Sequence, residues 1–240
     1  MRMTAMRNEP LQAYSLHQRP FQEKRSIYYL LTKEHGVLHG VAKKGIPQFV
    51  PLTLFASGKK SLKTLQQVHI AESVPSLMGQ QQYAALYVNE ITLKLLPVED
   101  SVPIIYEQYS QTMRQLQGVL SRDDLKMVLR AYEQVLFNEL GFAIDLDQDC
   151  DQYPIEAEPL YRFAPDRGWV KQLESDEKLD CAHIKASSAL LGRSIIAMRS
   201  GITTHTVNDW SQIHRQLIDH LFDYQPLQSR ILWQQFFRYQ

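Results

Sequence analysis

The feature that most constrains the fold is a change in the spacing of apolar residues near Gly79. Between residues 11 and 72 these residues come in short groups rich in Tyr, Ile, Val and Phe, separated by Gly, Pro and charged residues: AYSL, SIYYLL, GVLHGVA, FVPLTLF and LKTLQQVHI. Short runs of this kind between turn residues are typical of β-strands. Because a closed barrel leaves no long unpaired edge, we expect about five strands in a small closed antiparallel barrel.

After Gly79 the apolar spacing becomes that of an α-helix, beginning with QQYAALYVNEITLKLLP, in which Pro97 ends the helix. Two further helices are predicted over residues 103–120 and 123–140, and Gly141 supplies the left-handed position that ends the second of them. We expect these three helices to pack as a bundle.

The rest of the chain is predicted to be helical around an irregular acidic insertion at residues 145–180, with a short hairpin at YRFAPDRGWV. Helices resume in HIKASSALLGRSIIAMRS and TVNDWSQIHRQLIDHLFDY, and a last helix starts near Ser229. The fold class is therefore α+β: a barrel domain over residues 1–79 and an all-α helical domain over residues 80–240.

The charge balance is even over the whole chain but uneven along it. The chain has 240 residues, 26 Lys and Arg against 26 Asp and Glu, and no apolar run long enough to cross a bilayer. Residues 1–80 contain eleven basic residues against four acidic ones, a surplus of seven positive charges, and residues 141–180 contain eleven acidic residues against four basic ones. A basic N-terminal third favours a polyanion as the partner.

The two cysteines cannot form a disulfide framework, and the polar start MRMTAMRNEP is unlike a signal peptide, so we expect a cytoplasmic protein with no membrane role. Cys150, Cys181 and His183 are too few and wrongly spaced for a closed tetrahedral metal site. No phosphate-binding loop, G-x-S-x-G, H-E-x-x-H or dinucleotide fingerprint is present. We therefore expect no metal, no cofactor and no enzymatic activity.

Several stretches, taken in order, resemble the RecO family of bacterial DNA repair and recombination proteins. They are AYSLHQRPFQEKRSIYYLLTKEHGVLHGVAKKG for the first barrel strands, LKTLQQVHIAES for the last, LYVNEITLKLLP and LRAYEQVLFNELGFAIDL for two helices, and QPLQSR near the C-terminus. The resemblance implies an N-terminal oligonucleotide-binding (OB) barrel and a helical domain. It also implies that the protein anneals strands coated with single-stranded DNA-binding protein (SSB) and, together with RecR, helps to load RecA onto them. The same resemblance implies association with the nucleoid and no covalent chemistry.

The sequence departs from that family pattern at two places. AKKG runs directly into IPQFVPLTLF, where the family usually has a longer Gly/Arg/Lys-rich loop. Cys150 matches the first cysteine of the zinc-binding members, but Tyr153 stands at the C-x-x-C partner position. The first departure favours, as an alternative function, a protein-interaction adaptor whose barrel binds DNA only weakly.

The basic residues of the predicted barrel are the candidate DNA-binding groups, because clustered cations bind phosphates without reading bases. The set is Arg19, Arg25, Lys43, Lys44, Lys59, Lys60 and Lys63. Single-stranded DNA is the expected ligand, with double-stranded DNA left open. Aromatic residues near them, Tyr28, Tyr29, Phe49 and Phe55, either stack on bases or fill the barrel.

The helical domain is expected to bind the C-terminal tail of SSB, which the resemblance implies is a short acidic peptide ending in a phenylalanine carboxylate. Lys126 and Arg130 share one helix face, and Lys94 and Tyr132 are assigned to the same pocket. Arg130 is the first choice for the carboxylate, because its planar fork can grip both oxygens. The alternative is that Arg130 only pairs with Glu133 or Glu90.

Overall fold

The computed structural model describes residues 9–172 and 189–238, and contacts within the chain divide it into two units. The barrel unit comprises residues 1–120 and 227–240, and the second unit comprises residues 121–226. The domain boundary expected at Gly79 coincides with the start of the first helix, which the contacts group with the barrel. That boundary remains a prediction.

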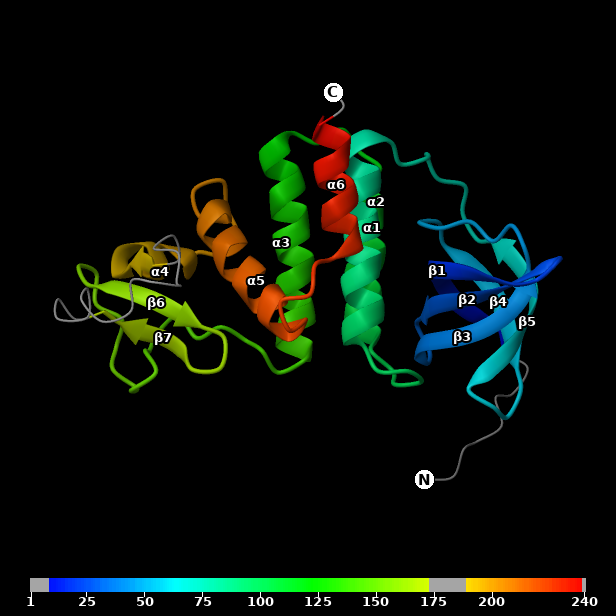
Figure 1. The fold of residues 1–240 in the computed structure, drawn as a ribbon, viewed down its shortest axis with the longest axis horizontal. Helices are drawn as coiled ribbons and strands as arrows, with labels where there is room; N and C mark the ends of the chain where they lie inside the picture. The colour runs from blue at the N-terminus through cyan, green and yellow to red at the C-terminus, as the bar shows by residue number, and fades with distance from the viewer. Residues whose placement is uncertain (1–8, 173–188, 239–240) are drawn as a thin grey trace. The chain divides into compact units, whose positions relative to one another are not determined.

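The barrel consists of five strands that close in the order β1-β2-β3-β5-β4 (Figure 1). Their bounds are Leu11–Gln22 for β1, Arg25–Thr32 for β2, Gly36–Lys43 for β3, Leu52–Ser57 for β4 and Leu62–Ile70 for β5. The closed five-stranded OB-type barrel expected from the sequence is confirmed, but it is not wholly antiparallel. After β3 the chain crosses the barrel, and β4 pairs antiparallel with β1. The last strand, β5, then lies between β4 and β3, where it runs antiparallel to β4 and parallel to β3.

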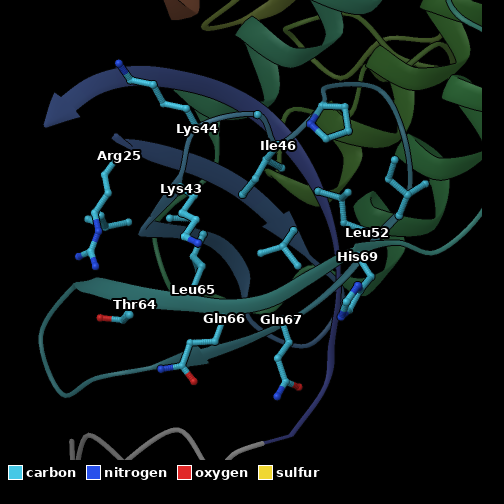
Figure 2. Close-up of a pocket in the computed structure, with 16 residues that line it drawn as sticks. Arg25, Lys43, Lys44, Ile46, Leu52, Thr64, Leu65, Gln66, Gln67 and His69 are labelled. Carbon is cyan, nitrogen blue, oxygen red and sulfur yellow. The ribbon is translucent and has the colours of Figure 1, made fainter. Parts of the chain in front are cut away.

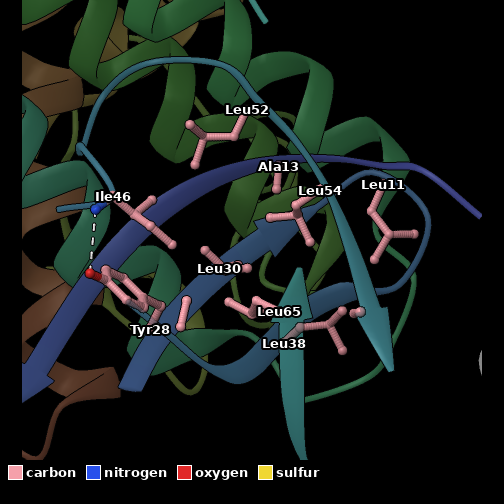
Figure 3. Close-up of a cluster of buried hydrophobic side chains, with 11 residues drawn as sticks. Leu11, Ala13, Tyr28, Leu30, Leu38, Ile46, Leu52, Leu54 and Leu65 are labelled. Carbon is pink, nitrogen blue, oxygen red and sulfur yellow. Dashed lines mark hydrogen bonds between the residues drawn. The ribbon is translucent and has the colours of Figure 1, made fainter. Parts of the chain in front are cut away.

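The barrel interior is filled by alternate residues of the strands, as a pleated strand requires (Figure 3). The large side chains of this core are Leu11, Tyr28, Leu30, Leu38, Ile46, Leu52, Leu54 and Leu65. Gly40 faces the core because Leu65 occupies the space that a Cβ would need, 2.4 Å from the nearest side-chain atom. The strand alternation therefore leaves the other residues of β1, β2 and β3 facing away from this core.

Three helices complete the barrel unit: α1 Gly79–Leu95, α2 Pro103–Leu116 and α6 Gln228–Arg238. Asn89 of α1 joins them to the barrel, because its side-chain amide donates to the carbonyl of Leu16 at 2.8 Å and accepts from the hydroxyl of Tyr109 on α2 at 2.6 Å. The predicted helix over residues 103–120 is correct but ends at Leu116.

The N-terminus of α6 is held by the carboxylate of Glu90 on α1. This carboxylate accepts hydrogen bonds from the backbone N–H of Gln228 and Ser229, at 3.0 and 2.8 Å, and from the Ser229 hydroxyl at 2.7 Å. Burial opposes ionisation of Glu90, but the hydrogen bonds from Lys94 and Ser229 outweigh it and lower its pKa. The segment QPLQSR thus supplies a helix start that a carboxylate far away in the sequence caps.

Gly36, which follows the turn between β2 and β3, is required by two constraints. Its φ is +64°, and a Cβ there would lie 1.7 Å from the carbonyl oxygen of Asp100. The backbone N–H of Glu99 also donates to the carbonyl of Val37 at 2.8 Å. A glycine is therefore needed where the α1–α2 connection closes over this end of the barrel.

The second unit contains the helices α3 Arg122–Glu139, α4 Gly192–Met198 and α5 Val207–Leu221. Ser121 caps α3 with a capping box to Asp124, and Gly141 has the expected left-handed φ of +83°. The helix α3 packs on α5 within this unit, whereas α1 packs on α2 and α6 in the barrel unit. The expected bundle of the first three helices remains a prediction.

A three-stranded sheet of order β7-β6-β8 completes the second unit. The hairpin predicted at YRFAPDRGWV is confirmed as β6 Leu160–Ala164 paired with β7 Gly168–Lys171. The helix predicted to start near residue 183 is wrong at Ala189–Leu191, which form β8; residues 183–188 lie outside the described part. Leu190 is buried opposite Tyr161 of β6, so sheet pairing overrides the local helical spacing.

Candidate nucleic-acid interface

One face of β1, β2 and β3 carries the candidate DNA-binding residues at the end of the barrel near the β1–β2 turn. Residues 25, 27 and 29 of β2 share this face, and the strand register places Arg25 opposite Lys43 and Ile27 opposite both Arg19 and Val41. Lys44 lies beside the same turn, because its backbone N–H donates to the carbonyl of Lys24 at 3.2 Å. Arg19, Arg25, Lys43 and Lys44 therefore gather on neighbouring strands.

The close pairing of cations is the electrostatic feature of this surface. Arg25 and Lys43 are exposed and stand directly opposite each other on antiparallel strands, a position in which like charges repel. Among the described residues, none of Arg19, Arg25, Lys43 and Lys44 forms an ion pair with a carboxylate, although Glu23 lies in the adjoining turn. An external anion is the group that would relieve this repulsion.

Tyr28 fixes the backbone that presents the two lysines. Its side chain is fully buried, and its hydroxyl donates to the carbonyl of Lys43 at 3.1 Å. The same hydroxyl accepts from the N–H of Ile46 at 3.3 Å (Figure 3). Tyr28 therefore fills the barrel and is not a base-stacking residue. The other aromatic candidates, Tyr29, Phe49 and Phe55, are half-buried.

A groove of about 850 Å³ opens beside the lysines, where β3 and β5 diverge after their short parallel pairing (Figure 2). Its floor is apolar, with Ile46, Leu52 and Leu65, and its rim is polar and basic: Arg25, Lys43, Lys44, Gln66, Gln67 and His69. The last residue of β5 that pairs with β3 is Thr64, and Gln67 further along β5 has a left-handed φ of +49° at an irregularity in the β4–β5 pairing. The groove extends the cationic surface toward β5.

The remaining barrel lysines divide into two kinds. Lys59 and Lys60 are exposed in the β4–β5 connection, as expected for phosphate-binding groups. Lys63 was expected to belong with them, and the structure corrects this: its side chain is only 3 % exposed and forms an ion pair with Glu99 at 2.8 Å. Lys63 alternates with exposed Leu62 and Thr64, so the pleat turns its side chain inward.

The candidate partner residues are held in internal contacts. Arg130 donates to the carboxylate of Glu133 at 2.6 Å, as one sequence alternative expected, and Lys126 contacts Asp123 and Asn208 at 3.0 and 3.1 Å. Lys94 pairs with Glu90 in the barrel unit. Tyr132 is fully buried in the second unit, so its assignment to a surface pocket is wrong.

Glu133 is also fully buried, and its second oxygen lies 2.9 Å from Nδ1 of His214. Burial lowers the pKa of His214, and the hydrogen bond to Glu133 opposes that effect. The other ring nitrogen, Nε2, is buried with no hydrogen-bond partner among the described residues. Protonation there would place an unsatisfied N–H among aromatic rings, since Trp210 and Phe137 both contact the imidazole edge-on.

Within the described residues no group of three or more His, Cys, Asp or Glu is arranged to hold a metal ion. Cys150 is a free thiol, and Cys181 and His183 lie outside the described residues. The acidic run shapes its own loop: Asp145 accepts from the N–H of Asp147, and Asp149 accepts from the N–H of Asp151. The absence of zinc remains a prediction, and elemental analysis of the purified protein is its test.

Three residues near the cations were missed in the sequence. Phe21 is 49 % exposed at the end of β1, and His17 and His39 flank Tyr29 on the outer face. The signal that could have found the histidines is strand register, because His17 and His39 both stand opposite Tyr29. The register of β1 against β2 shifts between Ser15 and His17, and an irregularity of this kind cannot be located from one sequence alone.

A closed OB-type barrel with exposed cations on one strand face is typical of nucleic-acid-binding proteins. The family model described as "Recombination protein O C terminal" matches residues 79–227. The DNA repair protein RecO of Marinobacter nauticus is 29% identical over 95% of this chain and 94% of its own. That of Pseudoalteromonas atlantica is 31% identical over 96% of both chains, and that of Stutzerimonas stutzeri is 37% identical over 65% of this chain and 67% of its own. The chain belongs to the RecO family.

Among the helices of the described residues, none is both long and apolar enough to span a bilayer.

Proposed function

We propose that this protein is a DNA repair and recombination mediator that binds DNA on the cationic face of its barrel and anneals complementary single strands. The observation that carries the proposal is the set of six exposed cations, Arg19, Arg25, Lys43, Lys44, Lys59 and Lys60, with Arg25 placed directly against Lys43. The names of the similar RecO proteins, all DNA repair proteins, support the same function.

Annealing follows from electrostatics alone. Two DNA strands repel each other through their phosphates, and a cationic surface that holds both lowers this repulsion while releasing counterions. The bases are left to pair with each other, since phosphate contacts carry no sequence information. The mechanism makes and breaks no covalent bond, and it requires no nucleophile, base, metal or cofactor.

The partners of this function are also proposals: the SSB tail, RecR, and RecA through RecR. For the tail, Arg130 remains the proposed carboxylate-binding group, with Lys126 four residues away on α3. Because Arg130 already bonds to Glu133, a tail carboxylate would have to share the guanidinium with that buried acid. Lys126 is one-third exposed and is the more accessible of the two.

The alternative function is a protein-interaction adaptor whose barrel binds DNA weakly. The short connection between β3 and β4, residues 44–51, favours it because this loop holds only one basic residue, Lys44. The two functions differ in whether the barrel cations act on DNA.

A strand-annealing assay tests the proposal. Charge reversal at Lys43, Lys44 and Lys60 to Glu should abolish annealing, because it replaces three phosphate-binding groups with repelling ones. The matched control reverses three exposed arginines of the second unit, Arg122, Arg193 and Arg215, and so makes the same change in net charge. If the lysine variant anneals strands at the parent's rate, the proposed barrel surface is wrong. If both variants lose annealing equally, the loss is caused by the change in net charge and not by the barrel surface.

A further inference from the structure

Three rings stand side by side on the outer face of the barrel, one from each of β1, β2 and β3. The ring centroids of His17 and Tyr29 lie 5.6 Å apart, and those of Tyr29 and His39 lie 4.6 Å apart. The register places His17 and His39 directly opposite Tyr29 on either side. The rings therefore form one continuous row across three strands, which we call the ring row.

The ring row shares its face with the cations. On β2, Arg25 and Tyr29 are four residues apart, and on β3 so are Lys43 and His39, which corresponds to about 13 Å along a strand. Arg19 lies two residues from His17 on β1, and after burial its charge is the second cause that lowers the pKa of His39. A nucleic-acid strand whose phosphates contact the cations would have its bases within reach of the rings.

The rings have no hydrogen-bonding role of their own. Several tyrosines of this unit are tied by their hydroxyls, as Tyr14 is to Ser110 and Tyr109 is to Asn89. Within the described residues, the side chains of His17, Tyr29 and His39 make no hydrogen bond. His17 is exposed, and Tyr29 and His39 are half-buried, so part of the row meets solvent.

The protonation state of His39 also suits stacking over phosphate binding. Burial and then the charge of Arg19 lower the pKa of His39 below its ordinary value, so this imidazole is neutral at neutral pH. A neutral ring offers a π-face and no positive charge to a phosphate. The row therefore complements the cations and does not duplicate them.

We propose that the ring row is a stacking platform for unpaired nucleobases, and that it makes the barrel prefer single-stranded DNA to duplex. The proposal rests on the DNA-binding function proposed above and adds the ligand's class. Bases stack on aromatic side chains irrespective of sequence, whereas duplex bases are already stacked on each other and are not available. The cations supply attraction for any polyanion, and the rings distinguish a strand with free bases from one without.

The test compares a mixed-sequence single-stranded oligonucleotide with an abasic phosphodiester of equal length at one salt concentration. The parent should bind the base-containing strand about tenfold more tightly, a conservative value for base stacking. Tyr29→Leu, which removes the central ring of the row, should lower this ratio severalfold and leave affinity for the abasic strand unchanged. Tyr29→Phe, which keeps the ring, should keep the ratio.

The other possible outcomes contradict either the stacking platform or the DNA-binding function. If Tyr29→Leu keeps the parent's ratio of affinities for the two strands, the stacking platform is wrong. This holds also if the variant melts at a lower temperature, because loss of a cross-strand contact alone would explain the lower melting temperature. If Tyr29→Leu does not fold, His17→Leu carries the test, since His17 is exposed. Failure of the parent to bind either strand would overturn the DNA-binding function itself, whereas equal binding of both strands by the parent would overturn the platform alone.

Discussion

The cations of the barrel face and those of helix α3 are the same residue types in opposite situations. Lys43 and Arg25 are exposed, face each other, and have no carboxylate partner in the described part of the chain. Arg130 is 13 % exposed and bonded to Glu133, which is itself buried against His214. The difference is whether the fold supplies an anion, and only where it does not is the cation available for an external one.

The lysines of the barrel show the same difference among themselves. Lys63 lies on the strand that follows Lys59 and Lys60, yet it points inward and pairs with Glu99. Position in the sequence puts all three lysines in one basic cluster, but the strand alternation assigns them opposite roles. Variants at these positions should therefore separate cations that stabilise the fold from cations that are available to a ligand.

The largest effect is expected at Glu133. Glu133→Ala removes the carboxylate that Arg130 and His214 share. Because removal of one partner from a buried ion pair is strongly destabilising, the free energy of unfolding should fall by about 3–5 kcal/mol. Denaturant unfolding of the variant measures this loss. Glu139→Ala, at an exposed position of the same helix, should stay within about 0.5 kcal/mol of the parent. Similar stability of both variants would show that the buried network does not hold this unit together.

A pair of variants tests whether Lys63 stabilises the fold while Lys43 binds DNA. Lys63→Met should lower the free energy of unfolding by about 2 kcal/mol, less than for Glu133 because Glu99 is 31% exposed and regains water. Lys43→Met should leave stability nearly unchanged and weaken DNA binding. If instead Lys63→Met lowers DNA affinity at full stability, the assignment of Lys63 to the interior is wrong.

The α3 cations give the next effect. Arg130→Ala should weaken binding of an acidic peptide ending in a phenylalanine carboxylate by at least about 1.5 kcal/mol, the lower range for a hydrogen bond to a charged group. Affinity for naked DNA should stay constant. Because Arg130 also supports Glu133, Lys126→Ala serves as a second variant, and both are measured where circular dichroism shows them folded. Parent-like peptide binding by both variants would remove this site.

His214 gives the smallest effect near neutral pH, and this effect grows as the pH falls. Its folded pKa lies below its ordinary value of 6.5, so as the pH falls through 6.5 the unfolded chain gains a proton that the folded side chain resists. Stability present above pH 6.5 is therefore lost on acidification, by up to about 1.4 kcal/mol per pH unit. Unfolding at pH 7, 6 and 5 should show a shallower decline for His214→Gln than for the parent. His205→Gln, at an exposed position, should match the parent.

The sequence predicted elements whose signals are local, and it missed those that depend on distant partners. Five apolar runs were enough for five strands, and Gly141 and Pro97 marked helix ends correctly. The parallel pairing of β3 with β5 and the strand at Ala189–Leu191 depend on register across many residues.

The residues of the candidate site also divide into those that the sequence located and those that it did not. Basic residues in turns, such as Lys44 and Lys60, were located from composition, because turns are exposed. The inward orientation of Lys63 and the burial of Tyr28 and Tyr132 were not, because side-chain direction in a barrel or a helix bundle is set by packing. The ring row required both register and exposure, and one sequence gives neither.

The central claim, that the barrel face binds DNA through unpaired cations, is tested most directly by the affinity of the parent for labelled single-stranded DNA across a salt series. If all six exposed cations contact phosphates, log K should fall linearly with log[salt] with a slope of about −4. The variant with Lys43, Lys44 and Lys60 reversed should show a slope shallower by about two or more, and the arginine control should keep the parent's slope. A flat dependence in the parent, or no binding at low salt, would contradict the account and leave the adaptor function in its place.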